Sequence, residues 1–114
     1  MAECLFCRII AGEVPGDFVY QDEEVVAFRD INPQAPVHVL VMPRKHIENY
    51  AAATPADDPL LGRLARTTAE IARDQGVLES GFRCVVNNGP DAQQSVPHLH
   101  VHVLGGRATS WPPG

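Results

Sequence analysis

Three of the five histidines of this chain stand at alternating positions, His98, His100 and His102. Side chains alternate faces along a β-strand, so imidazoles at this spacing project from one face, roughly 6.6 Å apart at the backbone. Imidazole titrates near neutral pH and histidine has no strong strand preference, so folding alone does not explain the row. The pattern indicates either a metal centre or a phosphoryl-transfer site with an imidazole nucleophile.

The residues around this row favour phosphoryl transfer. The preceding segment, 87–95, is polar and rich in turn residues, so its backbone N–H groups could line an anion pocket, and Ser95 adds a hydroxyl. No acidic residue lies within 98–104 to orient a metal-bound imidazole. A fourth histidine, His38, is in phase with Leu40 in another apolar segment, and it joins the row if the two strands share that face.

The elements that must position these side chains form a small α+β fold. Apolar and β-branched segments bounded by turn residues predict five strands, and mostly short connections favour an antiparallel sheet. The strands are expected over 18–21, 25–29, 37–42, 82–87 and 98–104. A short helix is expected over 4–11, ended by Gly12.

One long amphipathic helix is expected between Asp58 and Gly76. Asp58 is a suitable N-cap, Pro59 fits the first helical position, and Gly76 suits the left-handed residue that follows a last turn. Apolar or small residues recur between them at helical spacing, namely Leu61, Leu64, Thr68, Ile71 and Ala72. The helix is predicted to cover the face of the sheet that carries Leu99, Val101 and Val103.

Composition bounds the class of protein. The chain has 114 residues, 45% hydrophobic, and a net charge of -5, which predicts a single domain over 1–114 with its own core. The acidic balance disfavours nucleic acid and anionic membranes as partners, and no apolar stretch approaches the roughly 20 residues of a membrane span. The first residues lack the pattern of a secretory signal, and the three cysteines are an odd number. We therefore expect a reducing, cytoplasmic location, with Cys84 as a core thiol.

The segment His98–Leu104, three histidines alternating with apolar residues and then two apolar residues, resembles the signature of the histidine triad (HIT) superfamily. The resemblance extends to residues 28–38, to Gln94 and Ser95, and to residues 105–107 and 111–114, which are similar to the Hint branch of nucleoside phosphoramidate hydrolases. It runs from about Cys4 to the last residue. It implies a single HIT domain and a two-fold homodimer with Trp111 buried at the interface.

The resemblance also implies a role for each polar residue of the site. His100 matches the nucleophile, which attacks the α-phosphorus of a purine nucleoside 5′-phosphoramidate, expels the amine and forms a nucleotidyl-histidine that water hydrolyses. His102 matches the contact to the phosphate oxygens, and Ser95 the hydroxyl that hydrogen-bonds the leaving nitrogen. The implied catalytic set is completed by His98 and His38.

The same resemblance implies the nucleotide contacts. Asp30 matches the carboxylate that accepts hydrogen bonds from the ribose hydroxyls. Asn87 matches a residue that makes a polar contact on the phosphoester side. The base pocket falls on Phe6, Ile9, Phe28, Arg29, Ile31 and Leu40. Either purine fits an apolar slot, so the expected ligand is AMP, GMP or a phosphoramidate of either.

Cys4 and Cys7 form a Cys-x-x-Cys pair, which by itself is compatible with buried thiols, a redox pair or half of a zinc site. Nothing in the intervening Leu5 and Phe6 would activate a thiol, which disfavours the redox pair. The cysteine-bearing relatives bind zinc through two such cysteines and two histidines. The resemblance therefore implies a structural zinc held by Cys4, Cys7, His46 and His98, with no cofactor needed for catalysis.

Other functions stay open at this stage. Dinucleoside polyphosphate hydrolysis, as in the Fhit branch, is disfavoured by Ser95 and by the Trp-Pro-Pro-Gly tail. A nucleotidylyltransferase of the galactose-phosphate type is disfavoured by the third histidine and by the short chain. A nucleotide-binding regulatory or scaffold module with little turnover is an alternative from another class. A metal-dependent hydrolase that uses the three histidines is a further alternative.

Overall fold

The computed structural model describes residues 4–114. Residues 1–3, which belong to the predicted 1–114 domain and to the segment expected not to be a secretory signal, lie outside the described part. Along the chain the elements are α1 (Leu5–Ile10), β1 (Phe18–Gln21), β2 (Val25–Arg29), β3 (Val37–Pro43), the 3₁₀ turns η1 (Tyr50–Ala52) and η2 (Pro55–Asp57), α2 (Asp58–Asp74), β4 (Phe82–Val85) and β5 (Val101–Gly105).

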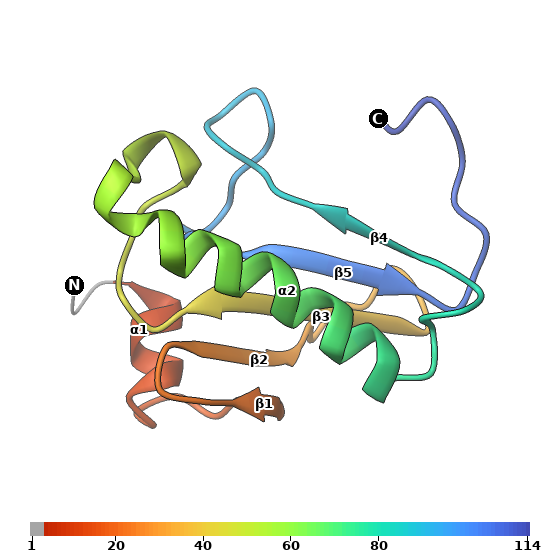
Figure 1. Ribbon diagram of the computed structural model, residues 1–114, viewed down its shortest axis with the longest axis horizontal. Helices are drawn as coiled ribbons and strands as arrows, with labels where there is room; N and C mark the ends of the chain where they lie inside the picture. Colours follow the sequence, from red (N-terminus) through yellow and green to blue (C-terminus); the bar gives the residue numbers. More distant parts are fainter. Residues whose placement is uncertain (1–3) are drawn as a thin grey trace.

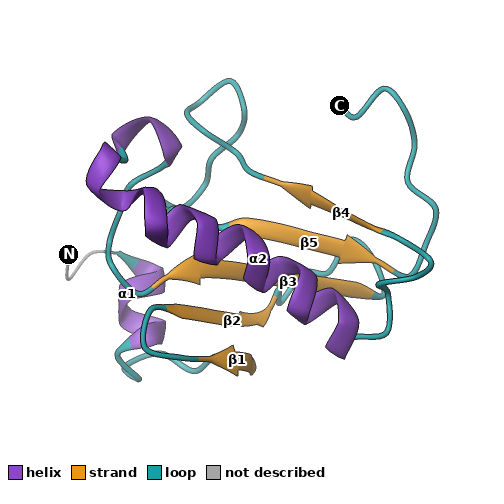
Figure 2. Ribbon diagram, viewed as in Figure 1, coloured by secondary structure: helices purple, strands orange, loops and turns teal. Residues whose placement is uncertain are grey.

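The strands form one sheet in the order β1-β2-β3-β5-β4, and every neighbouring pair is antiparallel (Figure 1). The long helix α2 lies across one face of this sheet, and the short helix α1 packs on the other (Figure 2). The predicted α+β architecture is confirmed. Neither helix in the described part of the chain has the length and apolar character needed to cross a membrane.

Side-chain alternation gives the sheet two apolar faces with different partners. Odd-numbered residues of the central strands pack with α2, and this cluster includes Val25, Ala27, Val39, Val41, Val101, Val103, Leu64 and Ile71. Even-numbered residues pack with Phe6 and Ile9 of α1, and this cluster includes Val26, Phe28, Leu40 and Met42. The histidines at 38, 100 and 102 therefore lie on the α1 side of the sheet.

The helix α2 begins one residue earlier than predicted. Asp57 occupies the N-cap position, and the predicted cap, Asp58, is the first helical residue. The carboxylate of Asp57 is already used, since it accepts a hydrogen bond from the Thr54 N–H and pairs with Lys45 at 2.6 Å. At the other end Gly76 has a φ of 79° and its N–H donates to the Arg73 carbonyl, which closes the last turn as predicted.

Two strands are shorter than expected. β4 ends at Val85, and β5 begins at Val101, so His98 and His100 precede the regular strand. The ladder ends there because the Leu99 N–H donates to the Ile47 carbonyl, at 2.7 Å, in the connection after β3. The side chains still alternate, since Leu99 packs in the α2 cluster.

We expect Leu64→Ala to destabilise the fold by about 2–5 kcal/mol, because Leu64 is 1% exposed and its loss leaves a cavity under α2. Leu78→Ala serves as the control, since Leu78 is 38% exposed and should change stability far less. Urea unfolding followed by circular dichroism measures both. Equal effects of the two substitutions would contradict this packing of α2.

Candidate active site

Three imidazoles gather on the α1 side of the sheet. His102 lies in β5 opposite Leu40 of β3, and His38 lies two residues earlier in β3. The rings of His100 and His102 are 5.1 Å apart between centroids, and so are those of His38 and His102. The structure thus brings His38 into the row of the other histidines, while His98 points to a neighbouring cluster described below.

The proton of His100 can be placed from its hydrogen bond. Its Nδ1 lies 2.7 Å from the His98 carbonyl oxygen, and because a carbonyl only accepts, Nδ1 must carry the proton. In the neutral ring Nε2 then carries the free lone pair. His100 is 5% exposed, and burial lowers its pKa from the ordinary 6.5. The neutral, Nδ1-protonated ring that this arrangement favours is a nucleophile.

A second chain of hydrogen bonds sets the tautomer of His102. The Gln34 N–H donates to Nδ1 of His38, at 3.0 Å, which leaves the His38 proton on Nε2. That nitrogen lies 2.9 Å from Nδ1 of His102 and 3.4 Å from a carboxylate oxygen of Asp30. When His38 donates to His102, the remaining His102 proton is on Nε2. Burial, with smaller contributions from His100 and His38, lowers the pKa of His102 to about 4.

A cavity of about 290 Å³ opens beside these histidines. All six residues of the implied base pocket line it: Phe6, Ile9, Phe28, Arg29, Ile31 and Leu40. Asp30, Ser95, His100 and His102 also line it, so the polar groups and the apolar walls share one space. Leu5 and Val96 line it as well, and nothing in their sequence context marked them.

Two of the six residues of the implied base pocket lie at the surface. Ile31 is fully exposed, on the segment that follows β2, and Arg29 pairs with Asp17 at 3.3 Å. Both border the cavity from outside its buried walls, unlike Phe6 and Phe28, whose rings meet edge to face at 5.4 Å between centroids.

Asn87 is the implied contact that the structure does not bring to the cavity. Its side-chain amide donates to the Ala92 carbonyl at 2.7 Å and so holds the loop that precedes Ser95. Gln94 fixes the same loop, because its amide oxygen accepts from the Gly89 N–H and its amide nitrogen donates to the Glu48 and Val96 carbonyls. Sequence reasoning missed this role of Gln94.

A second cluster joins α1 to the start of the histidine row. The sulfur of Cys4 lies 3.5 Å from Nδ1 of His98, and the sulfur of Cys7 lies 3.6 Å from that nitrogen and 3.3 Å from Nδ1 of His46. These four ligand atoms lie within 4.8 Å of one another. The structure therefore brings together all four residues implied as zinc ligands.

The donor set and its spacing fit zinc. Tetrahedral zinc with ordinary bonds to sulfur and nitrogen separates its ligand atoms by about 3.3–3.8 Å, which matches the distances above. Nε2 of His98 donates to the Pro43 carbonyl at 2.8 Å, so the lone pair of the neutral ring is on Nδ1, the atom that faces the sulfurs. Two sulfurs and two imidazole nitrogens make a closed site with no position for a substrate.

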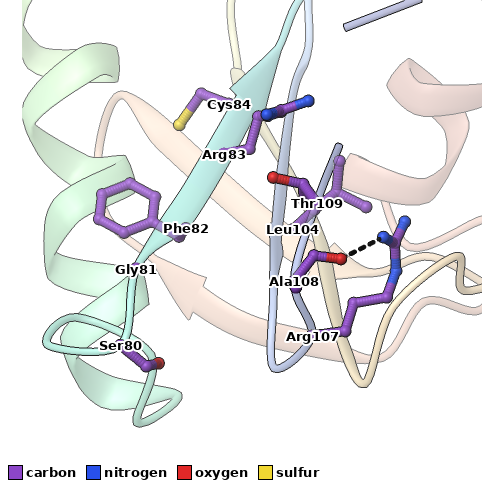
Figure 3. Close-up of a pocket in the computed structure, with 9 residues that line it drawn as sticks. All are labelled: Ser80, Gly81, Phe82, Arg83, Cys84, Leu104, Arg107, Ala108 and Thr109. Carbon is purple, nitrogen blue, oxygen red and sulfur yellow. Dashed lines mark hydrogen bonds between the residues drawn. The ribbon is translucent and has the colours of Figure 1, made fainter. Parts of the chain in front are cut away.

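A larger hollow of about 480 Å³ lies between β4 and the C-terminal segment (Figure 3). Its two guanidinium groups are already engaged with backbone carbonyls, Arg83 with Ser110 and Arg107 with Gln34 and Ala108. No histidine lines it, and it is not the candidate active site. Cys84 lies here and is exposed, so its assignment as a core thiol is wrong, because β4 is an edge strand.

Comparison with known proteins agrees with this geometry. The family model described as HIT domain matches residues 11–109. A 14 kDa zinc-binding protein of Zea mays is 47% identical over 112 residues, which cover 96% of this chain and 87% of the maize protein. The chain is similar in sequence to the maize protein over almost its whole length.

Solved structures show the same fold. A HIT family hydrolase from Legionella pneumophila superposes with a TM-score of 0.96 at 43% identity, covering 98% of this chain and 100% of that one. A histidine triad nucleotide-binding protein from Candida albicans superposes with a TM-score of 0.82 at 27% identity, covering 98% and 85%. The arrangement of the sheet and both helices is therefore shared with experimentally determined structures.

We expect the acid sensitivity of the fold to depend on His102. Its pKa is about 4 in the folded chain against the ordinary 6.5, so between these values the unfolded chain binds a proton that the folded chain does not. This stabilisation is fully present above pH 6.5 and is lost as the pH falls toward about 4. Between about pH 7 and about pH 5 the Tm of the wild type should fall further than the Tm of His102→Asn, and the difference between the two falls should be a few degrees.

Calorimetry on both proteins, each saturated with zinc, measures this difference. The proposed zinc ligands are the same in the two proteins, so loss of metal in acid affects both. Parallel dependences of Tm on pH would contradict a buried neutral His102.

Proposed function

The chain belongs to the HIT domain family, and from this membership and the geometry of the site we propose that it hydrolyses purine nucleoside 5′-phosphoramidates. The products are a nucleoside monophosphate and an amine. The observation that carries the proposal is the bond from Nδ1 of His100 to the His98 carbonyl, which leaves the Nε2 lone pair of a cavity-lining ring available for attack. The Legionella neighbour, named as a hydrolase, supports the reaction class.

The cavity supports a nucleotide as the ligand. Its aromatic and aliphatic walls suit a planar purine, with Phe6 and Phe28 as the largest surfaces. Asp30 is the carboxylate for the ribose: one oxygen accepts from the Asn32 N–H, and a carboxylate has lone pairs left for two hydroxyls. The Candida neighbour, named as a nucleotide-binding protein, supports the same ligand class.

The proposed reaction proceeds in two displacements. Nε2 of His100 attacks the α-phosphorus, the P–N bond breaks, and the leaving nitrogen gains a proton through the Ser95 hydroxyl, which lines the same cavity. Phosphorylated on Nε2 and still protonated on Nδ1, the ring is a cation, and the His98 carbonyl stabilises this charge. Water then attacks the phosphorus, releases the monophosphate and restores the proton to Ser95. His102 donates from Nε2 to the phosphate oxygens.

We also propose that Cys4, Cys7, His46 and His98 hold a structural zinc ion, which joins α1 to the connection after β3 and to the histidine row and takes no part in the chemical steps. The match of donors and spacing supports this assignment, and so does the maize relative, named as zinc-binding. The single domain over 1–114 and the cytoplasmic location remain part of the proposal.

Hydrolysis of adenosine 5′-phosphoramidate tests the proposed function. We expect His100→Ala to lower kcat by at least about a thousandfold while AMP binding persists, since the nucleophile is lost and the pocket walls remain. His100→Gln is the matched variant, because it keeps most of the side-chain bulk beside Phe6, whose ring centroid lies 5.0 Å away. It should be equally inactive.

The other outcomes distinguish the alternatives. Equal rates for wild type and His100→Ala, or AMP binding without turnover in the wild type, would replace the enzyme with a nucleotide-binding module. Faster cleavage of a dinucleoside polyphosphate than of the phosphoramidate would assign the chain to that hydrolase class instead.

A homodimer is the proposed assembly. Trp111 is 81% exposed in the single chain, on the C-terminal segment, where the Arg83 guanidinium donates to the Ser110 carbonyl. We expect light scattering to give twice the 12.4 kDa of one chain at micromolar protein, and Trp111→Ala to shift the mass toward one chain. Trp111→Phe should keep the dimer. A wild type of single-chain mass would refute this proposal.

A further inference from the structure

We propose that the metal site of Cys4, Cys7, His46 and His98 controls how tightly the cavity binds a nucleotide, because zinc there fixes α1 and α1 forms one wall of the cavity. Zinc and nucleotide are then linked ligands, each strengthening the binding of the other. This inference rests on the proposed function, since it requires the cavity to be a nucleotide site.

The first observation is that one short helix serves both sites. Cys4 caps α1 and Cys7 lies within it, and both supply sulfurs to the metal cluster. The same helix contributes Leu5, Phe6 and Ile9 to the cavity lining. A shift of α1 therefore changes both sites at once.

The second observation is how α1 is held. Among the described residues, the hydrogen bonds that join residues 4–14 to the rest of the fold all involve the sulfurs of Cys4 and Cys7. The ion pair of Arg8 with Glu13 stays within the segment. A helix of six residues is too short to be stable by itself, so once the metal is lost α1 would be held only by buried apolar contacts and by weak hydrogen bonds between these thiols and His46 and His98.

The third observation is that the nucleophile is anchored without the metal. The His98 ring donates to the Pro43 carbonyl, the His98 N–H to the Val96 carbonyl and the Leu99 N–H to the Ile47 carbonyl. These bonds fix the peptide whose carbonyl orients His100. Loss of zinc should therefore weaken nucleotide binding and raise KM, while kcat for bound substrate changes little.

Linkage makes the effect reciprocal. If removal of zinc weakens AMP binding by a certain factor, AMP must tighten zinc binding by the same factor. Coupling between two such sites commonly amounts to about 5–150-fold. We expect a value in that range, since one wall of the cavity is affected and the wall formed by β2 and β3 is not.

The experiment compares the full chain loaded with zinc and stripped by a chelator. Calorimetry with AMP should give a Kd at least about fivefold higher for the stripped protein than for the loaded protein. Titration with zinc should give a Kd for zinc that is lower in the presence of AMP than in its absence, by the same factor. With adenosine 5′-phosphoramidate, kcat should stay within about twofold. Amide hydrogen exchange should quicken in α1 and remain slow in β3 and β5.

Three variants sharpen the test. His46→Asn removes a ligand that lies outside α1 and the cavity lining, and at limiting zinc it should bind AMP as weakly as the stripped wild type. Phe6→Ala should weaken AMP binding to the loaded protein and reduce the effect of zinc on that binding. Cys84→Ser, which changes the free thiol on β4, should leave both affinities unchanged.

The outcomes separate the two proposals. Equal AMP affinity in loaded and stripped protein overturns the linkage and leaves the proposed function intact. Fast exchange throughout the sheet after zinc removal also overturns it, since zinc then stabilises the whole fold. A loaded protein that neither binds AMP nor cleaves the phosphoramidate overturns the proposed function and this inference with it.

Discussion

The position of His98 is the constraint on which both sites depend. Its Nε2 donates to the Pro43 carbonyl, its Nδ1 faces the sulfurs of Cys4 and Cys7, and its carbonyl accepts the Nδ1 proton of His100. One residue thus has every polar group of its ring and its carbonyl engaged, with no exposed surface. The tautomer of His100 follows from this backbone position, which is why the first histidine of the row matters although it is turned away from the cavity.

For the anionic ligand proposed above, the cavity beside this residue offers neutral donors. Burial lowers the pKa values of His38, His100 and His102, so these rings favour the neutral state at neutral pH. Of the residues that the structure describes, Arg29 is the only Lys or Arg side chain that lines the cavity, and it pairs with Asp17. A site of this kind stabilises charge with oriented N–H groups rather than with a fixed positive charge, and its nucleophile stays unprotonated. That combination suits a phosphoester or phosphoramidate with one negative charge.

Much of this arrangement could be predicted from the sequence, because strict alternation and helical spacing are local signals. The row at 98, 100 and 102, the long helix and the antiparallel sheet follow from them. Three features depend on contacts that no local pattern encodes: the bond from Leu99 to Ile47 that ends the β5 ladder, the capture of Asn87 by Ala92, and the exposure of Cys84 on an edge strand. Backbone groups set the tautomers of His38, His98 and His100, and a sequence pattern does not mark them because nearly every residue type supplies the same N–H and carbonyl.

The short helix α1 shows why a small protein of this kind benefits from a metal site beside its cavity. Six residues cannot repay the cost of helix nucleation through their own hydrogen bonds, and the exposed Leu5 shows that only part of the helix is buried. Cysteines three residues apart lie on one side of such a helix, and Phe6 and Ile9, with the same spacing, lie on another. A cross-link on the cysteine side therefore orders the apolar side as well. The proposed nucleophile, His100, directly precedes β5, and the proposed ribose carboxylate, Asp30, directly follows β2, so both adjoin the sheet and the helix is the wall whose order a bound ion would determine.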